Sequence, residues 1–421
     1  MTKNTKYLFI GIFFTLILIS LLLYHERIFP YLKQRESLKV GVLFSSTGTM
    51  AKSEQAVINA TLLAIEEINK NGGIDNKQII PIVYDGESNW KKYAQLAEKM
   101  IVQDKVSAII GCWTSASRKE VKPIIEKYDN LLIYPTQYEG AEESKNIIYL
   151  GATPNQQILP AISWAFEHVG KRVFLVGSDY IFPHVANEII HYEVQSRGGE
   201  IVGEKYILLG SKDVDSVIQE IIEKKPDVIF NTINGDTNIA FFERLYELSK
   251  GVQRPPVFSF SLSTADMDKI GGKKIKGDYA VWSYLTSQDN PENMTFLKKY
   301  KEKYGSTHDI NDPAATAYAG VHLWKQAVKE TSRALPSFVR DRMLRQSVAS
   351  PAGVIYIDPV NANAWRIVLI SQFTEKGQMD MIWTSVNPIE PIVYPDFKKK
   401  AEWDFFEYKL YMKWNNSWGN T

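Results

Sequence analysis

From Leu38 onward, short runs of β-branched and aliphatic residues alternate with longer amphipathic stretches. Apolar runs of this length, separated by segments with helical periodicity, are typical of parallel strands joined by crossover helices. The pattern therefore predicts an α/β fold, with a helix in most of the intervals between strands. The predicted strands are residues 38–44, 79–84, 106–110, 131–134, 173–176, 201–206, 228–232 and 257–260.

The segment after the first predicted strand has the periodicity of an amphipathic helix. Its apolar side chains recur on one face, which can pack on a sheet. These residues are Val57, Thr61, Ala64, Ile65 and Ile68. Gly72 and Gly73 follow and predict a left-handed cap that ends the helix. The loop Ser45–Thr49 precedes the helix, and its free backbone donors suit either a polar ligand or a tight turn.

The pattern changes after Asp278. Two further helices and three strand-like stretches are expected there, as an antiparallel finish to the chain. They are residues 292–304 and 313–331, then 353–358, 364–373 and 379–385. With 421 residues, of which 45% are hydrophobic, the chain can bury the cores of two domains. We therefore expect two lobes.

The last part of the chain predicts an amphipathic helix. Trp403, Phe406, Leu410 and Trp414 fall on one side, and a second set of residues is available for the solvent side. That second set is Lys399, Lys400, Glu407 and Lys413. The helix is expected either to dock on its own lobe or to contact a membrane interface or a partner protein, since Trp and Tyr suit such borders.

The N-terminus predicts a membrane anchor. Lys3 and Lys6 precede an apolar run from Tyr7 to Tyr24 that is long enough to cross most of a bilayer. No small residues follow the run as a signal-peptidase site would require. We expect an uncleaved transmembrane helix that tethers an exported, periplasmic or extracytoplasmic protein, with a cleaved signal peptide as the alternative.

Several classes of function lack support in the sequence. Lys plus Arg number 49 and Asp plus Glu number 48, so bulk charge does not favour nucleic acid as a partner. The single cysteine, Cys112, excludes an internal disulfide and a cysteine-rich metal site, and it is expected to be a small buried residue. Histidines are scattered, and phosphate-binding glycine motifs and a nucleophile elbow are missing. We expect a binding protein without cofactor or metal, and not an enzyme.

Polar and aromatic residues gather immediately after the ends of five predicted strands. In parallel sheets, ligands bind in the crevice beyond the carboxyl ends of the strands. The five strand-end segments are residues 45–49, 113–117, 135–139, 178–180 and 234–238. They are the candidate ligand-binding surface.

These segments and their neighbours resemble the bacterial urea and short-chain amide binding proteins of the type I periplasmic binding protein fold, which serve ABC importers. The resemblance runs from about Leu38 to Pro395. It is carried by the strings Gly48–Ala51, Asn71–Ile74, Gly111–Lys119, Tyr134–Gly140, Ala152–Gln157, Gly177–Pro183 and Asn231–Asp236.

The resemblance implies two Rossmann-like lobes with parallel sheets, joined by a three-stranded hinge. It places residues 38–153 and 280–350 in one lobe and residues 154–279 and 351–395 in the other. Residues 1–37 would be the anchor and its linker, and residues 396–421 an amphipathic tail. The ligand would lie in the cleft between the lobes.

The resemblance also implies the residues that bind the ligand. Ser115 and Thr136 would offer hydroxyl and backbone groups from the first lobe, and Tyr180 and Asp236 would close from the second. Trp113 and Tyr134 would wall the pocket, while Gln137 and Glu139 either bind the ligand or form bonds within the lobe. Urea has one carbonyl acceptor and four N–H donors, and such a mixture of polar groups with flat walls suits it.

The function implied is capture of urea or a short-chain amide by hinge closure, followed by delivery to the permease of an ABC importer. The alternative is a urea or amide sensor that reports to a regulatory partner without transport. Thr136 and Gln137 combine a residue of the amide sensors with one of the urea importers, so the choice of ligand stays open. A homodimer is also left open.

Overall fold

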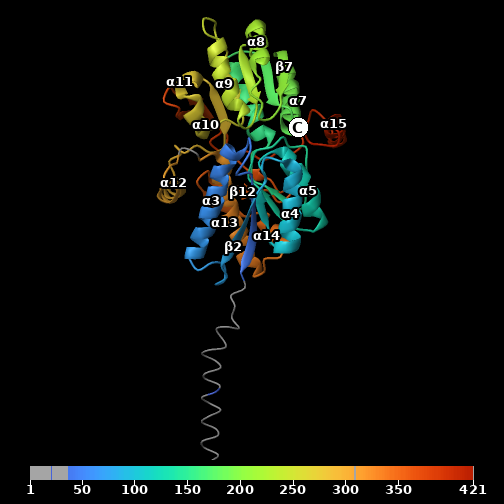
Figure 1. The fold of residues 1–421 in the computed structure, drawn as a ribbon, viewed down its shortest axis with the longest axis vertical. Coiled ribbons are helices and arrows are strands. Elements are labelled where there is room, and N and C mark those ends of the chain that lie inside the picture. Colours follow the sequence, from blue (N-terminus) through green and yellow to red (C-terminus); the bar gives the residue numbers. More distant parts are fainter. Residues whose placement is uncertain (1–19, 21–36, 308–309, 421) are drawn as a thin grey trace, which may run out of the picture.

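Residues 20, 37–307 and 310–420 are described in the computed structural model. Two α/β lobes lie end to end along the long axis of the molecule (Figure 1). The predicted N-terminal anchor, residues 7–24, falls outside the described residues apart from Ser20. Among the described residues, no helix has both the length and the apolar character that a membrane span requires.

In the described part of the chain, the first lobe contains a five-stranded parallel sheet with the order β2-β1-β3-β4-β5. Its strands are β1 (Leu38–Phe44), β2 (Ile79–Asp85), β3 (Ile109–Gly111), β4 (Leu132–Tyr134) and β5 (Ile147–Tyr149). The helices of this lobe are α3 (Ala51–Lys70), α4 (Trp90–Lys99), which continues into a π-helical turn at Met100–Asp104, α5 (Ser115–Lys127), α12 (Pro291–Tyr304), α13 (Asp312–Thr331) and α14 (Pro336–Met343).

The second lobe contains a seven-stranded sheet, again counted over the described residues, with the order β15-β14-β10-β9-β8-β6-β7. The strands are β6 (Arg172–Ser178), β7 (Glu200–Ile207), β8 (Val228–Thr232), β9 (Val257–Ser259), β10 (Tyr279–Trp282), β14 (Leu369–Phe373) and β15 (Met379–Thr384). Strands β6 to β10 pair in parallel, and β14 and β15 add the expected antiparallel finish. The helices are α6 (Ile158–His168), α7 (Ile181–Ser196), α8 (Asp215–Lys224), α9 (Thr237–Leu248), α10 (Thr264–Ile270) and α11 (Gly272–Ile275), with a 3-10 turn at Pro154–Gln156.

Helix α3 shows how the sequence pattern produces this packing. Val57, Ala64 and Ile68 are buried in the core of the first lobe, where α3 packs against α13. The Gly73 amide donates to the Ile68 carbonyl (2.9 Å), and both Gly72 and Gly73 have positive φ. The left-handed cap predicted for this helix is therefore confirmed.

The lobe boundaries differ from those expected in two places. Strand β10 pairs with β9 and β14, so residues 279–282 belong to the sheet of the second lobe and not to the first. A small antiparallel sheet, β11 (Ser347–Ser350), β12 (Gly353–Ile357) and β13 (Ala364–Trp365), packs with Ile355, Ile357 and Ala364 in the core of the first lobe. The predicted strand 364–373 is thus wrong as one element, because the chain changes lobes within it.

Two of the crossings between the lobes are linked by one carboxylate. Asp312, at the start of α13, accepts two hydrogen bonds from Arg366 Nη2 (3.1 and 2.9 Å) and one from the Ser283 amide (2.8 Å). Ser283 lies on one crossing and Arg366 on another, and Asp312 and Arg366 are both buried. This Asp312–Arg366–Ser283 hinge cluster links the two segments directly.

The C-terminal helix α15 (Lys400–Lys413) lies at the boundary of the lobes, beside α7 and near α5 (Figure 1). Trp403, Leu410 and Trp414 are buried, as the sequence predicts. Glu407 was expected on the solvent side, and this prediction is wrong: it is 7% exposed and forms an ion pair with Lys119 of α5 (2.8 Å). A cation from a distant part of the chain makes that burial tolerable.

Candidate functional site

The five strand-end segments meet between the lobes, as the sequence predicts. Trp113 Nε1 of the first lobe donates to Asn234 Oδ1 of the second (3.4 Å), and the Asn234 amide donates to Ser178 Oγ (3.0 Å). The Asp236 amide donates to Thr49 Oγ1 across the boundary (3.3 Å). Gln137 Nε2 reaches the Phe260 carbonyl of the second lobe (2.9 Å). The lobes are thus in direct contact around the candidate site.

Ser115 lies at the first turn of α5 and belongs to a buried charge cluster. Its hydroxyl donates to Glu139 and accepts from Arg118 Nη1 (3.0 Å), while Arg118 Nη2 donates to Glu139 (3.0 Å). Ser115 is 2% exposed, and Arg118 and Glu139 are 0% exposed. Glu139 therefore bonds within its own lobe, which is one of the two roles that the sequence left open for it.

The same cluster extends away from the site through a second carboxylate. Arg118 Nε donates to Glu142 (2.9 Å), and Lys119 Nζ donates to both Glu142 (3.0 Å) and Glu407 (2.8 Å). Burial alone would raise the pKa of Glu142, but Arg118 and Lys119 hold that pKa well below its usual value. Each of the two buried cations is consequently matched by carboxylates, and neither is left to pair with a charged ligand.

The backbone at Cys112 is in an unusual conformation, next to the aromatic residues of the site. Cys112, directly after β3, has φ +68, a left-handed conformation that few residues with a side chain adopt. Trp113 follows it, and its carbonyl accepts from the Tyr134 hydroxyl (2.6 Å). The Arg118 guanidinium lies over the Tyr134 ring, 4.9 Å from the centroid. Trp113 and Tyr134 are therefore fixed in place before any ligand enters.

Thr136 and Gln137 occupy the segment after β4, which is held close to the first crossing. A Cβ on Gly151 would lie 1.9 Å from the Thr136 carbonyl oxygen, so only glycine permits this approach. The Thr136 hydroxyl makes one long bond, to the Cys112 carbonyl (3.5 Å). Gln137 Oε1 is buried and has no hydrogen-bond partner. A buried acceptor left in this way can bind an N–H donor.

Tyr180 comes from the second lobe, at the residue before α7. It is 1% exposed, and its ring lies against that of Trp90 from the first lobe, with centroids 5.9 Å apart. Burial raises the pKa of Tyr180 well above its usual value, and the neighbouring Tyr134 and Glu139 add to this. The Tyr180 hydroxyl therefore stays protonated and can donate or accept a hydrogen bond. The Trp90 indole N–H is buried without a partner.

The carboxylate of Asp236 is not brought together with the other predicted residues. Its side chain is 39% exposed, and the nearest cation, Lys269, lies 3.8 Å away at the surface. Helix α9 begins at the next residue, so the Asp236 side chain turns outward while its amide faces Thr49. Of the seven predicted residues, Trp113, Ser115, Tyr134, Thr136, Gln137 and Tyr180 converge, and Asp236 contributes its backbone.

Another buried acid was missed by the sequence reasoning. Glu54, in the first turn of α3, accepts from the Ser45 amide (2.5 Å) and from the Tyr93 hydroxyl (2.8 Å). Burial raises the pKa of Glu54 from 4.5 to about 8. The carboxyl is therefore neutral at pH 7 and holds the loop Ser45–Thr49, which touches the second lobe through Thr49. No charge pattern around residue 54 signals this role, because Ser45, in the loop after β1, and Tyr93, in α4, are distant from Glu54 in the chain.

Two further observations concern the thiol and the metal-binding types of side chain. Cys112 is buried, and burial raises the pKa of its thiol above the usual value. Over the residues that the structure describes, no group of three or more His, Cys, Asp or Glu side chains is placed to hold a metal ion. What the arrangement can do is bind a small molecule through hydroxyl, amide and indole groups.

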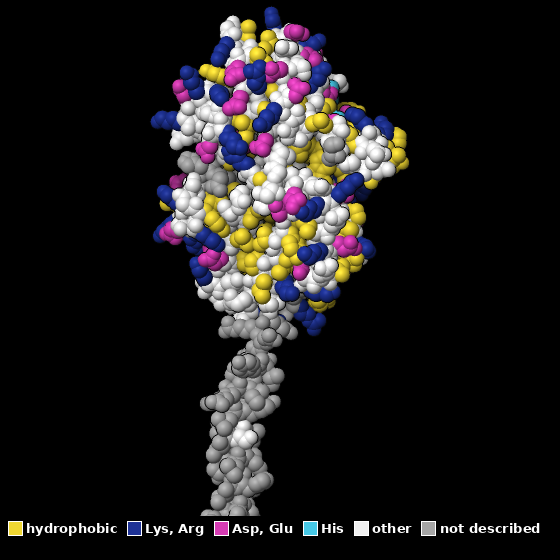
Figure 2. Space-filling view, in the orientation of Figure 1, with side chains coloured by type: hydrophobic (Ala, Val, Ile, Leu, Met, Phe, Trp, Pro, Cys, Tyr) yellow, Lys and Arg dark blue, Asp and Glu magenta, His cyan; other side chains and the backbone are white. Residues whose placement is uncertain are grey.

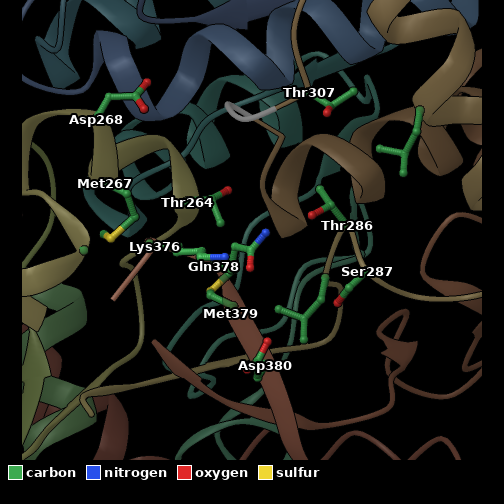
Figure 3. A pocket seen from close by; sticks show the side chains of 14 residues that line it. Thr264, Met267, Asp268, Thr286, Ser287, Thr307, Lys376, Gln378, Met379 and Asp380 are labelled. Atoms are coloured by element: carbon green, nitrogen blue, oxygen red, sulfur yellow. The ribbon is translucent and has the colours of Figure 1, made fainter. Parts of the chain in front are cut away.

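A separate groove opens on the other side of the lobe boundary. Its volume is about 510 Å³, and Figure 3 shows the side chains that line it, from α10, the segment after β10 and the turn between β14 and β15. Thr264, Thr286, Lys376, Gln378 and Asp380 are among them. None of these residues belongs to the five strand-end segments, so the groove is distinct from the candidate site.

Comparison with known proteins places the chain among binding proteins. The model of the family described as "Periplasmic binding protein domain" matches residues 38–400. Leu/Ile/Val-binding protein homolog 6 of Brucella suis is 22% identical over 76% of this chain and 83% of its own length. The leucine-, isoleucine-, valine-, threonine- and alanine-binding protein of Pseudomonas aeruginosa is 21% identical over 78% of this chain and 87% of its own length.

Two solved structures share the fold. A solute-binding protein of an ABC transporter from R. palustris, in complex with 4-hydroxybenzoate, superposes with a TM-score of 0.77 at 21% identity, covering 83% of this chain and 97% of its own. The branched-chain amino acid binding protein LivJ of Streptococcus pneumoniae, in complex with isoleucine, gives 0.73 at 21% identity, covering 85% and 100%. At this level of identity the likeness is one of fold.

Proposed function

The chain belongs to the periplasmic binding protein family, and on that premise we propose that it captures urea or a short-chain amide between its lobes and delivers it to the permease of an ABC importer. As an extracytoplasmic solute-binding protein of the ABC-transporter type, it works by closing on its ligand. The solved relatives named above are complexes with 4-hydroxybenzoate and isoleucine, so the choice of a small neutral ligand does not come from them.

The charge balance of the site is the observation that carries this choice. Arg118 faces Glu139 and Glu142, and Lys119 faces Glu142 and Glu407. A carboxylate ligand would be buried beside Glu139 without a cation of its own, and burying an unpaired charge costs several kcal/mol. A neutral amide avoids that cost.

The hydrogen-bonding groups available at the site complement an amide. Gln137 Oε1 offers an acceptor for an N–H group, the Trp90 indole offers a donor, and the Tyr180 hydroxyl can act as either. Trp113 and Tyr134 supply flat walls. The lobes contact each other directly, Trp113 with Asn234 and Gln137 with Phe260, which supports a small ligand over a large one.

The small size of urea limits how tightly it can bind. Urea has four heavy atoms, and a ceiling of about 1.5 kcal/mol per atom limits its binding free energy to about 6 kcal/mol, a Kd of tens of micromolar. Titration calorimetry of the purified protein should therefore give a Kd of tens of micromolar or weaker for urea and acetamide, and a weaker one for the smaller formamide. Benzoate and isoleucine should bind at least a hundredfold more weakly. Tighter binding of either carboxylate than of every amide would refute the choice of ligand.

We also propose that residues 7–24 anchor the protein in the cytoplasmic membrane. The observation behind this is the apolar run that follows Lys3 and Lys6. Cell fractionation, followed by N-terminal sequencing of the mature protein, tests it. Recovery of the protein in the soluble periplasmic fraction, with residues 1–24 removed, would contradict the anchor and leave the ligand proposal untouched.

A further inference from the structure

The C-terminal segment, residues 396–420, touches both lobes with surfaces of different character. We call it the strap. The family match ends at residue 400, where helix α15 begins, so most of the strap lies outside the family's shared domain. Figure 2 shows hydrophobic side chains at the right edge of the molecule, where Figure 1 places α15 against the boundary between the lobes.

The strap is fixed to the second lobe by apolar contacts and backbone bonds. Trp403, Leu410 and Trp414 belong to the same buried cluster as the side chains of α7. Beyond the helix, the Trp418 carbonyl accepts from the Ile181 amide (2.9 Å), and Asn420 donates to the carbonyl (2.9 Å) and carboxylate (3.0 Å) of Asp179. These contacts surround Tyr180, the candidate ligand residue of this lobe.

The contacts with the first lobe include two ion pairs and a cation–π contact. Glu407 pairs with Lys119 (2.8 Å), the Trp418 ring lies 5.0 Å from the Lys119 ammonium, and Lys400 pairs with Glu143 (2.7 Å). A cavity of about 430 Å³ remains between the strap and this lobe, lined by Lys119, Lys122, Glu142, Tyr394, Glu407 and Trp418 among others. A seam of this kind separates more easily than a packed apolar one.

Gly419 closes the seam at the candidate site. An added Cβ would lie 2.5 Å from the Trp90 ring of the first lobe and 2.5 Å from Tyr180 Cβ of the second. The backbone of residue 419 therefore fills the narrow space between these two side chains. If the lobes separated about the hinge, Trp90 would leave Gly419, and Lys119 would leave Glu407 and Trp418.

We propose that the strap is a closure latch: it travels with the second lobe and grips Lys119, Glu143 and Trp90 of the first lobe only when the cleft is closed. Its contacts add to those of a ligand, so they bias the hinge toward the closed form and slow the escape of a bound solute. The latch rests on the proposed function only in that a solute is retained by closure. Its effect on the hinge is independent of which solute binds.

The decisive measurement is the distance between the lobes without ligand. Cysteines replacing the exposed Lys91 and Lys212 place a spin label on each lobe, and the native Cys112 is buried and stays unlabelled. The full-length chain is used. The test variants are Lys400→Glu, which sets a carboxylate against Glu143, Glu407→Gln and Gly419→Val. The control is Lys409→Glu, which makes the same charge change on an exposed face of α15.

We expect the control to keep the distance distribution of the unmodified strap. Each test variant should shift the distribution to longer distances, with the ratio of closed to open molecules falling at least tenfold in Gly419→Val. Because Lys400 is exposed, that variant folds and keeps the test valid. Identical distributions in all three variants and the control would overturn the latch.

The kinetics of ligand release give a second arm. Stopped-flow dissociation of urea from Lys400→Glu and Gly419→Val should be at least tenfold faster than from the control. If urea fails to bind the unmodified protein, the proposed function fails, and the distance measurement still decides the latch. If urea binds and leaves all variants at the same rate, the latch fails, and the proposed function stands.

Discussion

Replacing Glu54 by Gln should change how the stability of the protein depends on pH. Glu54 is buried, and burial raises its pKa from 4.5 to about 8 in the folded protein. The folded state therefore binds one more proton than the unfolded state between these two values. Its contribution to stability is complete below pH 4.5 and is lost as pH rises toward 8.

The size of the effect follows from the shift. A difference of about 3.5 units corresponds to about 5 kcal/mol at about 1.4 kcal/mol per unit, an upper bound on what ionisation of Glu54 costs the folded state above pH 8. Glutamine keeps an oxygen for the Ser45 amide and the Tyr93 hydroxyl, and it cannot ionise. The variant should match the unmodified protein at pH 5 and exceed it by several kcal/mol at pH 9.

Guanidinium chloride unfolding at pH 5, 7 and 9 measures this, with urea avoided because it is the proposed ligand. Glu167→Gln, at an exposed position, serves as the matched control, and its stability should follow the unmodified protein at every pH. Equal differences between Glu54→Gln and the unmodified protein at pH 5 and pH 9 would refute the assignment of a neutral buried carboxyl. Above pH 8 the loop Ser45–Thr49 should also loosen, and ligand affinity should fall in the unmodified protein only.

Three further predictions concern the site. Gln137→Leu removes the buried acceptor Oε1, and calorimetry should show urea affinity lower by roughly five- to a hundredfold, as expected for 1–3 kcal/mol; unchanged affinity would remove Gln137 from the site. Tyr180→Phe should weaken binding up to about tenfold, whereas Asp236→Asn should stay within about twofold, because its carboxylate faces Lys269; the reverse order in the same titrations would contradict the geometry. Arg118→Met removes the buried cation that pairs with Glu139 and one of the two that pair with Glu142. It should destabilise the fold by about 3–5 kcal/mol in guanidinium unfolding, a loss that a surface Arg197→Met should not reproduce.

The sequence could predict most strands of the two sheets because they are apolar runs separated by segments with helical periodicity. The buried strand β8, Val228–Thr232, begins and ends at the predicted residues. The strands β5, β10 and β11 were missed, although the equally short strands β3, β4 and β9 overlap predicted ones. The prediction of one strand over residues 364–373 is wrong, because this stretch forms two strands. β13 pairs with β12 in the first lobe, and β14 pairs with β10 in the second.

The sequence predicted where the candidate site lies in the fold better than it predicted the hydrogen bonds and ion pairs within it. The rule that ligands sit beyond the carboxyl ends of parallel strands brought five segments together correctly. It did not reveal that Ser115 and Glu139 are joined through Arg118, because that network depends on side-chain directions. For the same reason, Glu407 was expected to face solvent. It is buried because it pairs with Lys119, which is far away in the chain.

The Asp312–Arg366–Ser283 hinge cluster has a consequence for how the lobes can move. Asp312 binds two of the crossing segments at once, so we expect these two segments to move together when the lobes move. We expect this link to restrict twisting of one lobe against the other and to favour bending. A donor and an acceptor fluorophore, one on each lobe, would then follow the opening and closing of the cleft. Their energy transfer would report the concentration of the solute.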